Sequence, residues 1–210
     1  MSDFSPDEVE PDNCVFLFVG LAVIFFGIRD QAMAEILVGV TGGIAAYKTA
    51  MIVSQLRQTG HGVSVVMTES ATKLVGKSTF EALSGRLVRT SVFCSDRGHL
   101  HIELAREADL FCIAPATANI LSKAANGIAD DLVSTLILSF DKTIIFAPAM
   151  NPSMWNKPVI QNNVKKLIDF GATIIYPEFG RTSCGEVGIG RMAAPESIVK
   201  EIEKYISQKN

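Results

Sequence analysis

The stretch ILVGVTGGIAAYKTAMIVSQLRQTG, residues 36–60, decides the fold class of this 210-residue chain. Its first five residues, Ile36–Val40, are mostly β-branched or apolar and predict a short strand. Apolar residues then recur at helical spacing over Ile44–Gln58, and Gly60 marks the end of that helix. The turn Thr41–Gly43 joins the two elements. A strand, a glycine turn and a helix form the first unit of a doubly wound α/β fold.

The same alternation continues to the end of the chain. Further strands are predicted over Val63–Met67, Leu110–Ala114, Thr143–Phe146 and Ala172–Tyr176, with an edge strand over Arg86–Phe93. Helices are predicted over Thr72–Ser84, Ile120–Ala125, Asp130–Leu138, Pro158–Phe170 and Pro195–Ile206. The pattern indicates one parallel sheet with helices on both faces, in three α/β/α layers. Residues 177–194 have no core pattern, and a stretch of this kind is usually functional or disordered.

Composition excludes several classes of protein. Hydrophobic residues make up 48% of the chain and charged residues 20%, which is typical of a folded globular protein. The net charge is −3, and without residues 1–33 the remainder carries only +2, so no basic face for nucleic acid is expected. The four cysteines have no paired spacing, which argues against a disulfide framework or a zinc site and indicates a reducing, cytoplasmic setting. These cysteines are Cys14, Cys94, Cys112 and Cys184.

Residues 1–33 are expected to lie outside the folded domain, which we place at residues 34–210. The apolar run Cys14–Ile28 follows an acidic leader and has 15 residues, whereas a spanning helix needs roughly 20. A signal peptide would need a positive leader. We therefore expect no membrane partner and interpret Met33 as the physiological start, with a short interfacial anchor as the competing idea.

Three loops are predicted at the carboxyl ends of strands, where open α/β sheets bind ligands. Thr41–Gly43 and Pro115–Asn119 offer small residues at helix starts, where a phosphate could sit. The glycine turn matches neither the dinucleotide nor the triphosphate fingerprint. The third loop, Ala147–Trp155, is compatible with either a rigid connection or a ligand-binding turn. From the residues alone, the chain is a cytoplasmic α/β domain that binds a phosphorylated ligand.

Two further pairs of residues were candidates for metal ligands. His99 and His101 are two positions apart, so on a helix they would point in different directions. Asp130 and Asp131 precede a predicted helix, and we interpret them as its cap. No metal site is predicted.

Six motifs, in order, carry a resemblance that covers essentially all of residues 35–210. They are VTGGIAAYK (40–48), HIELA (101–105), APATAN (114–119), GIADD (127–131), APAMNPSMW (147–155) and SCGEVGIGRM (183–192). Together they resemble the flavin-dependent cysteine decarboxylase family, and within it the phosphopantothenoylcysteine decarboxylases of coenzyme A biosynthesis. The fold of that family is a flavodoxin-like (Rossmann-like) doubly wound parallel sheet.

The resemblance implies that FMN binds at a subunit interface. The residues implied in FMN binding are Gly42, Gly43, Ile44, Thr68, Thr117, Ala118, Asn119 and Ala149. Among the residues implied in catalysis, His101 matches the essential histidine, because it precedes Ile-Glu-Leu. Asn151 matches the asparagine that binds the substrate carboxylate, with Met154 beside it, and Cys184 matches a cysteine on a mobile flap that supplies a proton. Trp155 is assigned to packing.

The implied reaction is the FMN-dependent decarboxylation of 4'-phosphopantothenoylcysteine to 4'-phosphopantetheine, through thioaldehyde and enethiolate intermediates. The enzyme would be a carboxy-lyase that forms homotrimers or homododecamers. A separate phosphopantothenate–cysteine ligase is expected in the pathway. Glu107 and Glu186 depart from the family pattern, but neither position puts the activity in doubt.

Two alternatives stay open. A peptidyl-cysteine decarboxylase of peptide maturation would share His101 and Asn151, although Cys184 disfavours it. A phosphatase-regulatory flavoprotein would carry a long acidic tail, and the acidic leader here is short.

Overall fold

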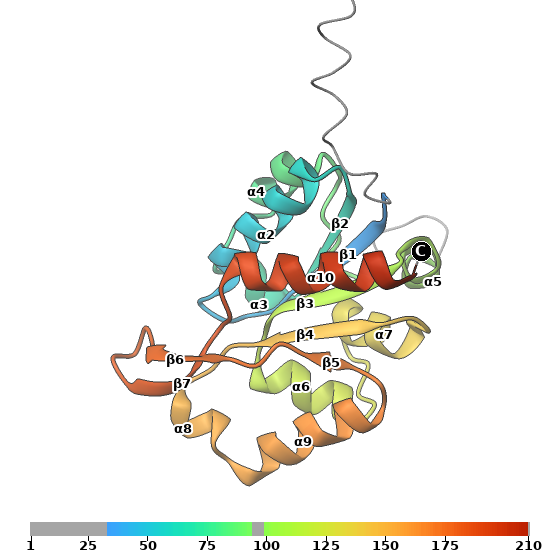
Figure 1. The fold of residues 1–210 in the computed structure, drawn as a ribbon. Helices are drawn as coiled ribbons and strands as arrows, with labels where there is room; N and C mark the ends of the chain where they lie inside the picture. Colours follow the sequence, from blue (N-terminus) through green and yellow to red (C-terminus); the bar gives the residue numbers. More distant parts are fainter. Residues whose placement is uncertain (1–32, 94–98, 210) are drawn as a thin grey trace, which may run out of the picture. The chain divides into compact units, whose positions relative to one another are not determined.

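Five parallel strands form the central sheet of this computed structural model, which describes residues 33–93 and 99–209 (Figure 1). The strand order is β2-β1-β3-β4-β5, with every neighbouring pair parallel. The predicted doubly wound sheet is therefore confirmed. The strands are β1 (Glu35–Val40), β2 (Gly62–Met67), β3 (Leu110–Ala116), β4 (Ile144–Pro148) and β5 (Thr173–Ile174). The predictions for residues 1–32, including the interfacial anchor, lie outside the described residues.

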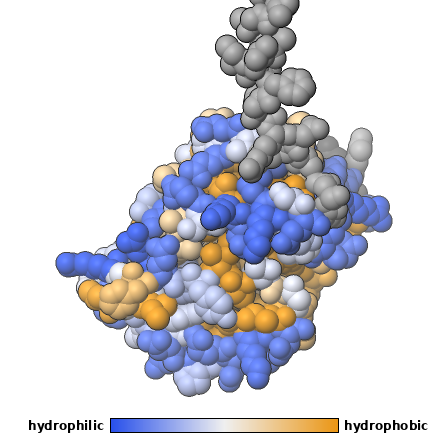
Figure 2. Space-filling model, in the orientation of Figure 1, coloured by the Kyte–Doolittle hydropathy of each residue, from blue (hydrophilic) through white to orange (hydrophobic). Residues whose placement is uncertain are grey.

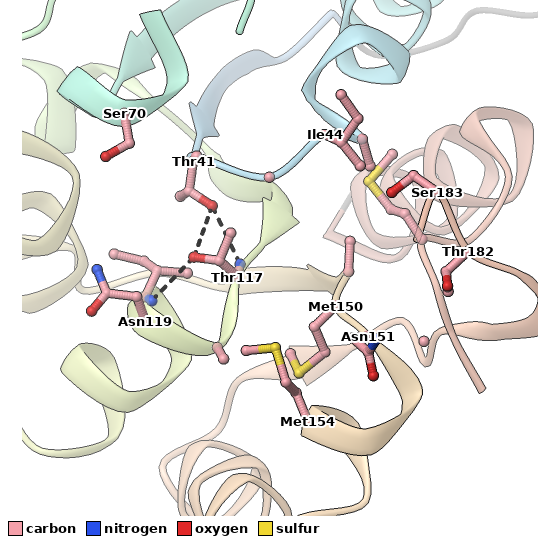
Figure 3. Close-up of a pocket in the computed structure, with 18 of the residues that line it drawn as sticks. Thr41, Ile44, Ser70, Thr117, Asn119, Met150, Asn151, Met154, Thr182 and Ser183 are labelled. Atoms are coloured by element: carbon pink, nitrogen blue, oxygen red, sulfur yellow. Dashed lines mark hydrogen bonds between the residues drawn. The ribbon is translucent and has the colours of Figure 1, made fainter. Parts of the chain in front are cut away.

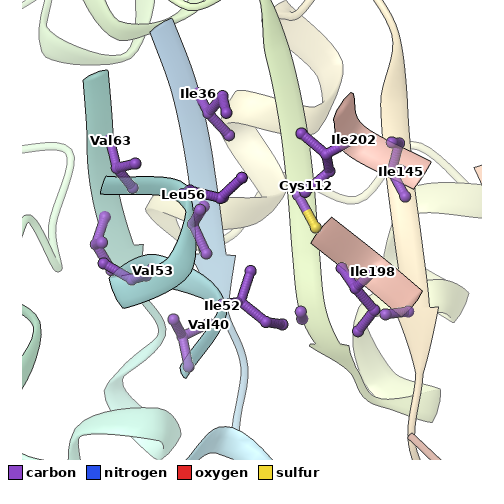
Figure 4. Packing of buried hydrophobic residues seen from close by; sticks show 14 of the residues in the cluster. Ile36, Val40, Ile52, Val53, Leu56, Val63, Cys112, Ile145, Ile198 and Ile202 are labelled. Atoms are coloured by element: carbon purple, nitrogen blue, oxygen red, sulfur yellow. The ribbon is translucent and has the colours of Figure 1, made fainter. Parts of the chain in front are cut away.

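Helices cover both faces of the sheet. One face is covered by α2 (Ala46–Gln58), α4 (Lys77–Ser84) and α10 (Pro195–Lys209). The opposite face is covered by α5 (Leu100–Glu107), α6 (Ala118–Ala125), α7 (Leu132–Ser139) and α9 (Pro158–Asp169). Each face has its own apolar core, and Figure 4 shows Ile52 of α2 and Ile198 of α10 packed near Cys112 of β3. Because β3 is buried along its whole length, its run of apolar residues has no polar face.

Two elements differ from their predictions. The predicted edge strand over Arg86–Phe93 is wrong: only Arg89 forms a bridge, with Val66 at the edge of β2. The Arg89 N–H donates to the Val65 carbonyl at 3.2 Å, and the Arg89 carbonyl accepts from the Met67 N–H at 2.9 Å, but within residues 86–93 no strand extends beyond this residue. The Arg86 guanidinium pairs with the Glu35 carboxylate, with Nη1 and Oε2 at 2.6 Å.

The single helix predicted over Thr72–Ser84 is also wrong. The chain forms a short α3 (Glu69–Thr72) and then α4. Gly76 separates them, because its extended backbone (φ −65°, ψ 141°) cannot continue a helix.

Residues 177–194 form an antiparallel hairpin that the sequence pattern did not predict. Its strands are β6 (Glu178–Arg181) and β7 (Val187–Arg191), joined by residues 182–186. The hairpin packs against α8 (Pro152–Trp155), beyond the carboxyl end of β4 (Figure 1). Gly190 lies so close to the Met150 carbonyl that an added Cβ would overlap it, and its own carbonyl accepts from the Met150 N–H at 2.9 Å.

Two local predictions, the cap of α7 and the packing of Trp155, agree with the structure. Asp131 caps α7 by accepting from the Ser134 N–H at 2.8 Å, which completes a capping box. Trp155 is buried and meets the Tyr176 ring edge-to-face, with ring centroids 6.3 Å apart. Cys112 is buried within β3. Among the described residues, no helix is both long and apolar enough to cross a membrane.

Candidate active site

A cavity of ≈ 1130 Å³ lies at the carboxyl edge of the sheet, between the strand-end loops and the hairpin (Figure 3). All three loops singled out from the sequence contribute to its lining, together with the start of α3 and the hairpin. The volume slightly exceeds the roughly 300–1,000 Å³ typical of small-ligand pockets, so a cofactor and a substrate could both fit. The prediction of ligand binding at strand ends therefore has a cavity to support it.

Eleven of the twelve predicted site residues line this cavity. They are Gly42, Gly43, Ile44, Thr68, Thr117, Ala118, Asn119, Ala149, Asn151, Met154 and Cys184. The structure thus brings together residues that are more than 140 positions apart in the chain. Their individual roles stay predictions.

The sheet side of the cavity is built around Thr41, which is only 2% exposed. Its hydroxyl donates to the Pro115 carbonyl oxygen at 2.5 Å. The same hydroxyl accepts from the Thr117 N–H at 3.3 Å (Figure 3). Thr117 in turn caps α6 by accepting from the Ile120 N–H at 3.4 Å. We call Thr41, Pro115 and Thr117 the floor network. Sequence reasoning did not assign a role to Thr41, although a polar residue directly after a buried strand was a usable signal.

The start of α2 leaves room for an anion. Thr68 caps α3 and Thr117 caps α6, whereas Ala45, the N-cap residue of α2, provides no side-chain cap. An added Cβ on Gly42 would overlap the Ser70 Cβ, so this turn accepts no larger residue. The Gly43 and Ala46 N–H groups donate to the Thr41 and Gly43 carbonyls, at 2.8 and 2.9 Å. The positive end of the helix dipole at an uncapped helix start favours negative charge. The residues present therefore fit the phosphate of a flavin nucleotide.

The hairpin side of the cavity brings Asn151 and Cys184 into contact. The Asn151 Oδ1 accepts from the Ser153 N–H and from the Ser153 hydroxyl, each at 2.7 Å. This fixes the amide orientation, because the oxygen must face the backbone donor. The Asn151 Nδ2 then donates to the Cys184 Sγ at 3.0 Å. An amide N–H group and a thiol therefore share one end of the cavity.

The two described cysteines have opposite environments. Burial in β3 raises the pKa of the Cys112 thiol to about 12. The pKa of the exposed Cys184 thiol is lowered, first by its hydrogen bond with Thr182 and then by hydrogen bonds from the Glu186 backbone and Asn151. A more accessible thiolate is the state needed for proton exchange and nucleophilic chemistry. Of the two described cysteines, Cys184 has the exposure and the lowered pKa that favour a thiolate.

His101 is the one predicted site residue that does not line the cavity. It lies in the first turn of α5, which packs against α7. Its Nδ1 is the only buried side-chain nitrogen or oxygen in the described part of the chain without a hydrogen-bond partner. Within one copy of the chain, His101 is not brought to Asn151 and Cys184.

Lys123 is a cavity residue that sequence reasoning missed. Its ammonium group pairs with Asp130 at 2.6 Å and with Asp131 at 2.8 Å, and its side chain is 15% exposed. Desolvation opposes the charge of Lys123, yet the two aspartates raise its pKa overall. No group of three or more potential metal-ligating His, Cys, Asp or Glu side chains occurs within residues 33–93 and 99–209.

Comparison with known proteins agrees with this geometry. The family model described as Flavoprotein matches residues 28–207. Among curated proteins, the coenzyme A biosynthesis bifunctional protein CoaBC of Mycolicibacterium smegmatis is 46% identical over 168 residues, which is 80% of this chain and 41% of that protein. The Bacillus subtilis protein of the same name is 43% identical over 176 residues, 83% of this chain and 43% of that protein. The chain thus spans less than half the length of these relatives.

Solved structures show the same fold. A PPC decarboxylase variant in complex with pantothenoylaminoethenethiol superimposes with a TM-score of 0.74 at 30% identity, over 83% of this chain and 99% of that one. The FMN-dependent cysteine decarboxylase SpaF also gives a TM-score of 0.74, at 31% identity over 85% of this chain and 98% of that one. The resemblance inferred from the six motifs is confirmed, and the chain belongs to the Flavoprotein family.

Proposed function

We propose that this chain is an FMN-dependent carboxy-lyase that converts 4'-phosphopantothenoylcysteine to 4'-phosphopantetheine in coenzyme A biosynthesis. The observation that carries the proposal is the contact between Asn151 Nδ2 and Cys184 Sγ, 3.0 Å apart in a cavity that also holds an uncapped helix start. Similarity to CoaBC proteins and to a PPC decarboxylase structure supports it.

Several cavity residues would hold FMN. The turn Gly42–Ile44 and Thr68 would hold its phosphate, because the uncapped start of α2 carries the positive end of the helix dipole at this point. Thr117, Ala118, Asn119 and Ala149, which line the neighbouring wall, would contact the ring. When bound, FMN supplies the electron sink that a β-thiol carboxylate lacks.

Asn151 and Cys184 have complementary roles in this proposal. The Asn151 amide donates to the substrate carboxylate and orients it, which lowers the entropic cost of reaching the reactive geometry. Cys184 protonates the substrate after carbon dioxide has left, and the lowered pKa of its thiol eases that proton transfer. Met154, which is 45% exposed, packs against the substrate.

His101 would act from a second copy of the chain. It lies outside the cavity of its own copy, and its Nδ1 has no partner among the described residues. Figure 2 shows a hydrophobic cluster over the hairpin, at the left of the view, where Phe179, Val187 and Ile189 are exposed. Exposed apolar patches of this kind mark interaction surfaces. We therefore propose a homotrimer, or trimers assembled into a homododecamer, in the cytoplasm. A phosphopantothenate–cysteine ligase would supply the substrate.

Purified protein tests the proposal through its visible spectrum and its release of carbon dioxide from phosphopantothenoylcysteine. We expect a yellow, FMN-loaded protein that decarboxylates this substrate. His101→Asn should stay yellow without turnover, and Cys184→Ser should accumulate a decarboxylated, oxidised enethiol. Full activity in His101→Asn would reject the role of that histidine.

A cysteine-containing peptide serves as the competing substrate. The similarity to SpaF makes this comparison necessary. Turnover of the peptide without turnover of phosphopantothenoylcysteine would assign the chain to peptide maturation instead.

A further inference from the structure

The direction of the hydrogen bond between Thr182 and Cys184 depends on whether Cys184 is protonated. The Thr182 Oγ1 is 3.0 Å from the Cys184 Sγ and also 3.0 Å from the Glu186 carbonyl oxygen. A hydroxyl group has one hydrogen, so it donates to only one of these two atoms at a time. In the bond with Cys184, either atom can be the donor.

The two possible donor arrangements match the two protonation states of Cys184. When Cys184 is a thiol, its S–H donates to Thr182 Oγ1, and the Thr182 hydroxyl donates to the Glu186 carbonyl oxygen. When Cys184 is a thiolate, the Thr182 hydroxyl turns and donates to Sγ. The Glu186 carbonyl keeps a partner in both states, because the Thr182 backbone N–H donates to it at 2.8 Å.

We propose that Thr182 is a positioning residue for proton donation by Cys184, whose hydroxyl moves its hydrogen bond from the Glu186 carbonyl to Sγ as the proton leaves. The inference rests on the proposed function and extends it to a residue without an assigned role. In the step itself, the Cys184 S–H bond breaks, the proton passes to the substrate, and the electron pair stays on sulfur. The thiolate later takes a proton from solvent, and the Thr182 hydroxyl returns to Glu186.

Thr182 is needed most when substrate is bound. The Asn151 amide donates to Sγ in the structure, but in the proposed function it must also face the substrate carboxylate. The Thr182 hydroxyl and the Glu186 backbone N–H then stay as donors that belong to the hairpin. A hydrogen bond to a charged group is stronger than one between neutral groups, so the bond from Thr182 favours the thiolate.

The charged groups around Cys184 do not replace this contact. Glu186 opposes the thiolate by its negative charge. Arg181 of β6 and Arg191 of β7 line the cavity, but neither is among the causes that lower the pKa of Cys184. α8, which packs on the hairpin, contributes no charged side chain. The direction of the Cys184 pKa agrees with the geometry, since its hydrogen bond with Thr182 is the largest cause of the lowered value.

Alkylation of the FMN-loaded protein by iodoacetamide, measured against pH without substrate, tests the proposal. Thr182→Val keeps the shape of the side chain and the backbone N–H but removes the hydroxyl. We expect its alkylation profile to move to higher pH by about one unit, which is a tenfold lower thiolate fraction at pH values well below the pKa. Thr182→Ser restores the hydroxyl and should follow the original protein. Ser183→Ala is the matched control, because Ser183 adjoins Cys184 in the same loop, and its profile should not move.

Turnover gives a second readout. Thr182→Val should lower kcat about tenfold with KM nearly unchanged, and should accumulate the same decarboxylated enethiol as Cys184→Ser. An unmoved alkylation profile in Thr182→Val, or an equal shift in Ser183→Ala, would overturn the proposal. A protein that does not decarboxylate phosphopantothenoylcysteine at all would reject the proposed function, while the alkylation profiles would still decide the role of Thr182.

Discussion

The floor network and the hairpin loop, residues 182–186, face the same cavity but are held by different means. Thr41 is 2% exposed and bonds to the Pro115 carbonyl and the Thr117 N–H, both of which belong to the sheet edge. Cys184 is exposed, and its partners Thr182 and Asn151 are themselves reached from solvent. The floor network is buried at the end of the sheet, whereas the hairpin packs against α8.

This difference separates two tasks. A buried hydrogen-bonded network gives one rigid arrangement, which suits a surface that holds a cofactor. An exposed loop can rotate a hydroxyl or release an amide at low cost, which suits groups that must change partners during a reaction. Changes in one wall should therefore affect stability, and changes in the other should affect turnover.

The largest effect is expected from Gly190→Ala. The new Cβ would overlap the Met150 carbonyl oxygen and lie 3.1 Å from the Pro152 backbone nitrogen, so the hairpin must move away from α8. A displacement of about 1 Å can lower a rate by roughly 10²-fold. We expect this loss in carbon dioxide release with FMN content unchanged. Gly76→Ala, where an added Cβ meets nothing within 4 Å, is the control. Loss of FMN from Gly190→Ala would show that the two walls are not independent.

Thr41→Val tests whether the floor network stabilises the fold. The substitution keeps the volume but leaves the buried Pro115 carbonyl and Thr117 N–H without their partner. Such a loss costs roughly 1–3 kcal/mol of unfolding free energy, measured by urea denaturation of the FMN-free protein. Thr79→Val, on the exposed surface of α4, should change little. Equal destabilisation by both variants would contradict a stabilising role for the buried hydrogen bonds of the floor network.

The smallest effect is expected where Lys123 meets Asp130 beside the cavity. A hydrogen bond from Lys123 is the main cause that lowers the pKa of the exposed Asp130 carboxyl below its ordinary 3.8. A carboxylate whose pKa is lowered in the folded state adds stability above its ordinary pKa and loses it as pH falls through the lowered value. Lys123→Met should thus be slightly less stable than the original protein at about pH 7, and the gap should shrink below about pH 4.

Urea midpoints of both proteins across this pH range provide the measurement. Lys77→Met, at an exposed position of α4, is the control, and its difference from the original protein should not vary in the same way. If the difference in stability between Lys123→Met and the original protein stays unchanged at acidic pH, the ion pair is not its cause.

The sequence predicted the floor better than the hairpin, for physical reasons. β1, β3 and β4 are continuous apolar runs, and the helices between them repeat at 3.6 residues, so the strand ends and their loops could be located. β6 and β7 contain Gly180, Gly188 and Gly190 and are mostly exposed, so no alternation marks them as strands. Cys184 and Asn151 were found through motifs. Their contact could not be predicted, because it depends on how the hairpin packs against α8. The bond between Thr182 and the Glu186 carbonyl depends on the hairpin conformation.

At the N-cap of α8, the two ends of the Asn151 amide group serve folding and ligand recognition separately. The helix start needs only an oxygen at position 151, which Oδ1 provides to the Ser153 N–H. An aspartate would meet that need equally well, since Asn and Asp are comparable caps. The amide nitrogen is therefore not needed for the cap, and its N–H group favours a negatively charged partner at this corner of the cavity. Asn151→Asp would leave α8 intact and turn the corner from one that attracts a carboxylate into one that repels it.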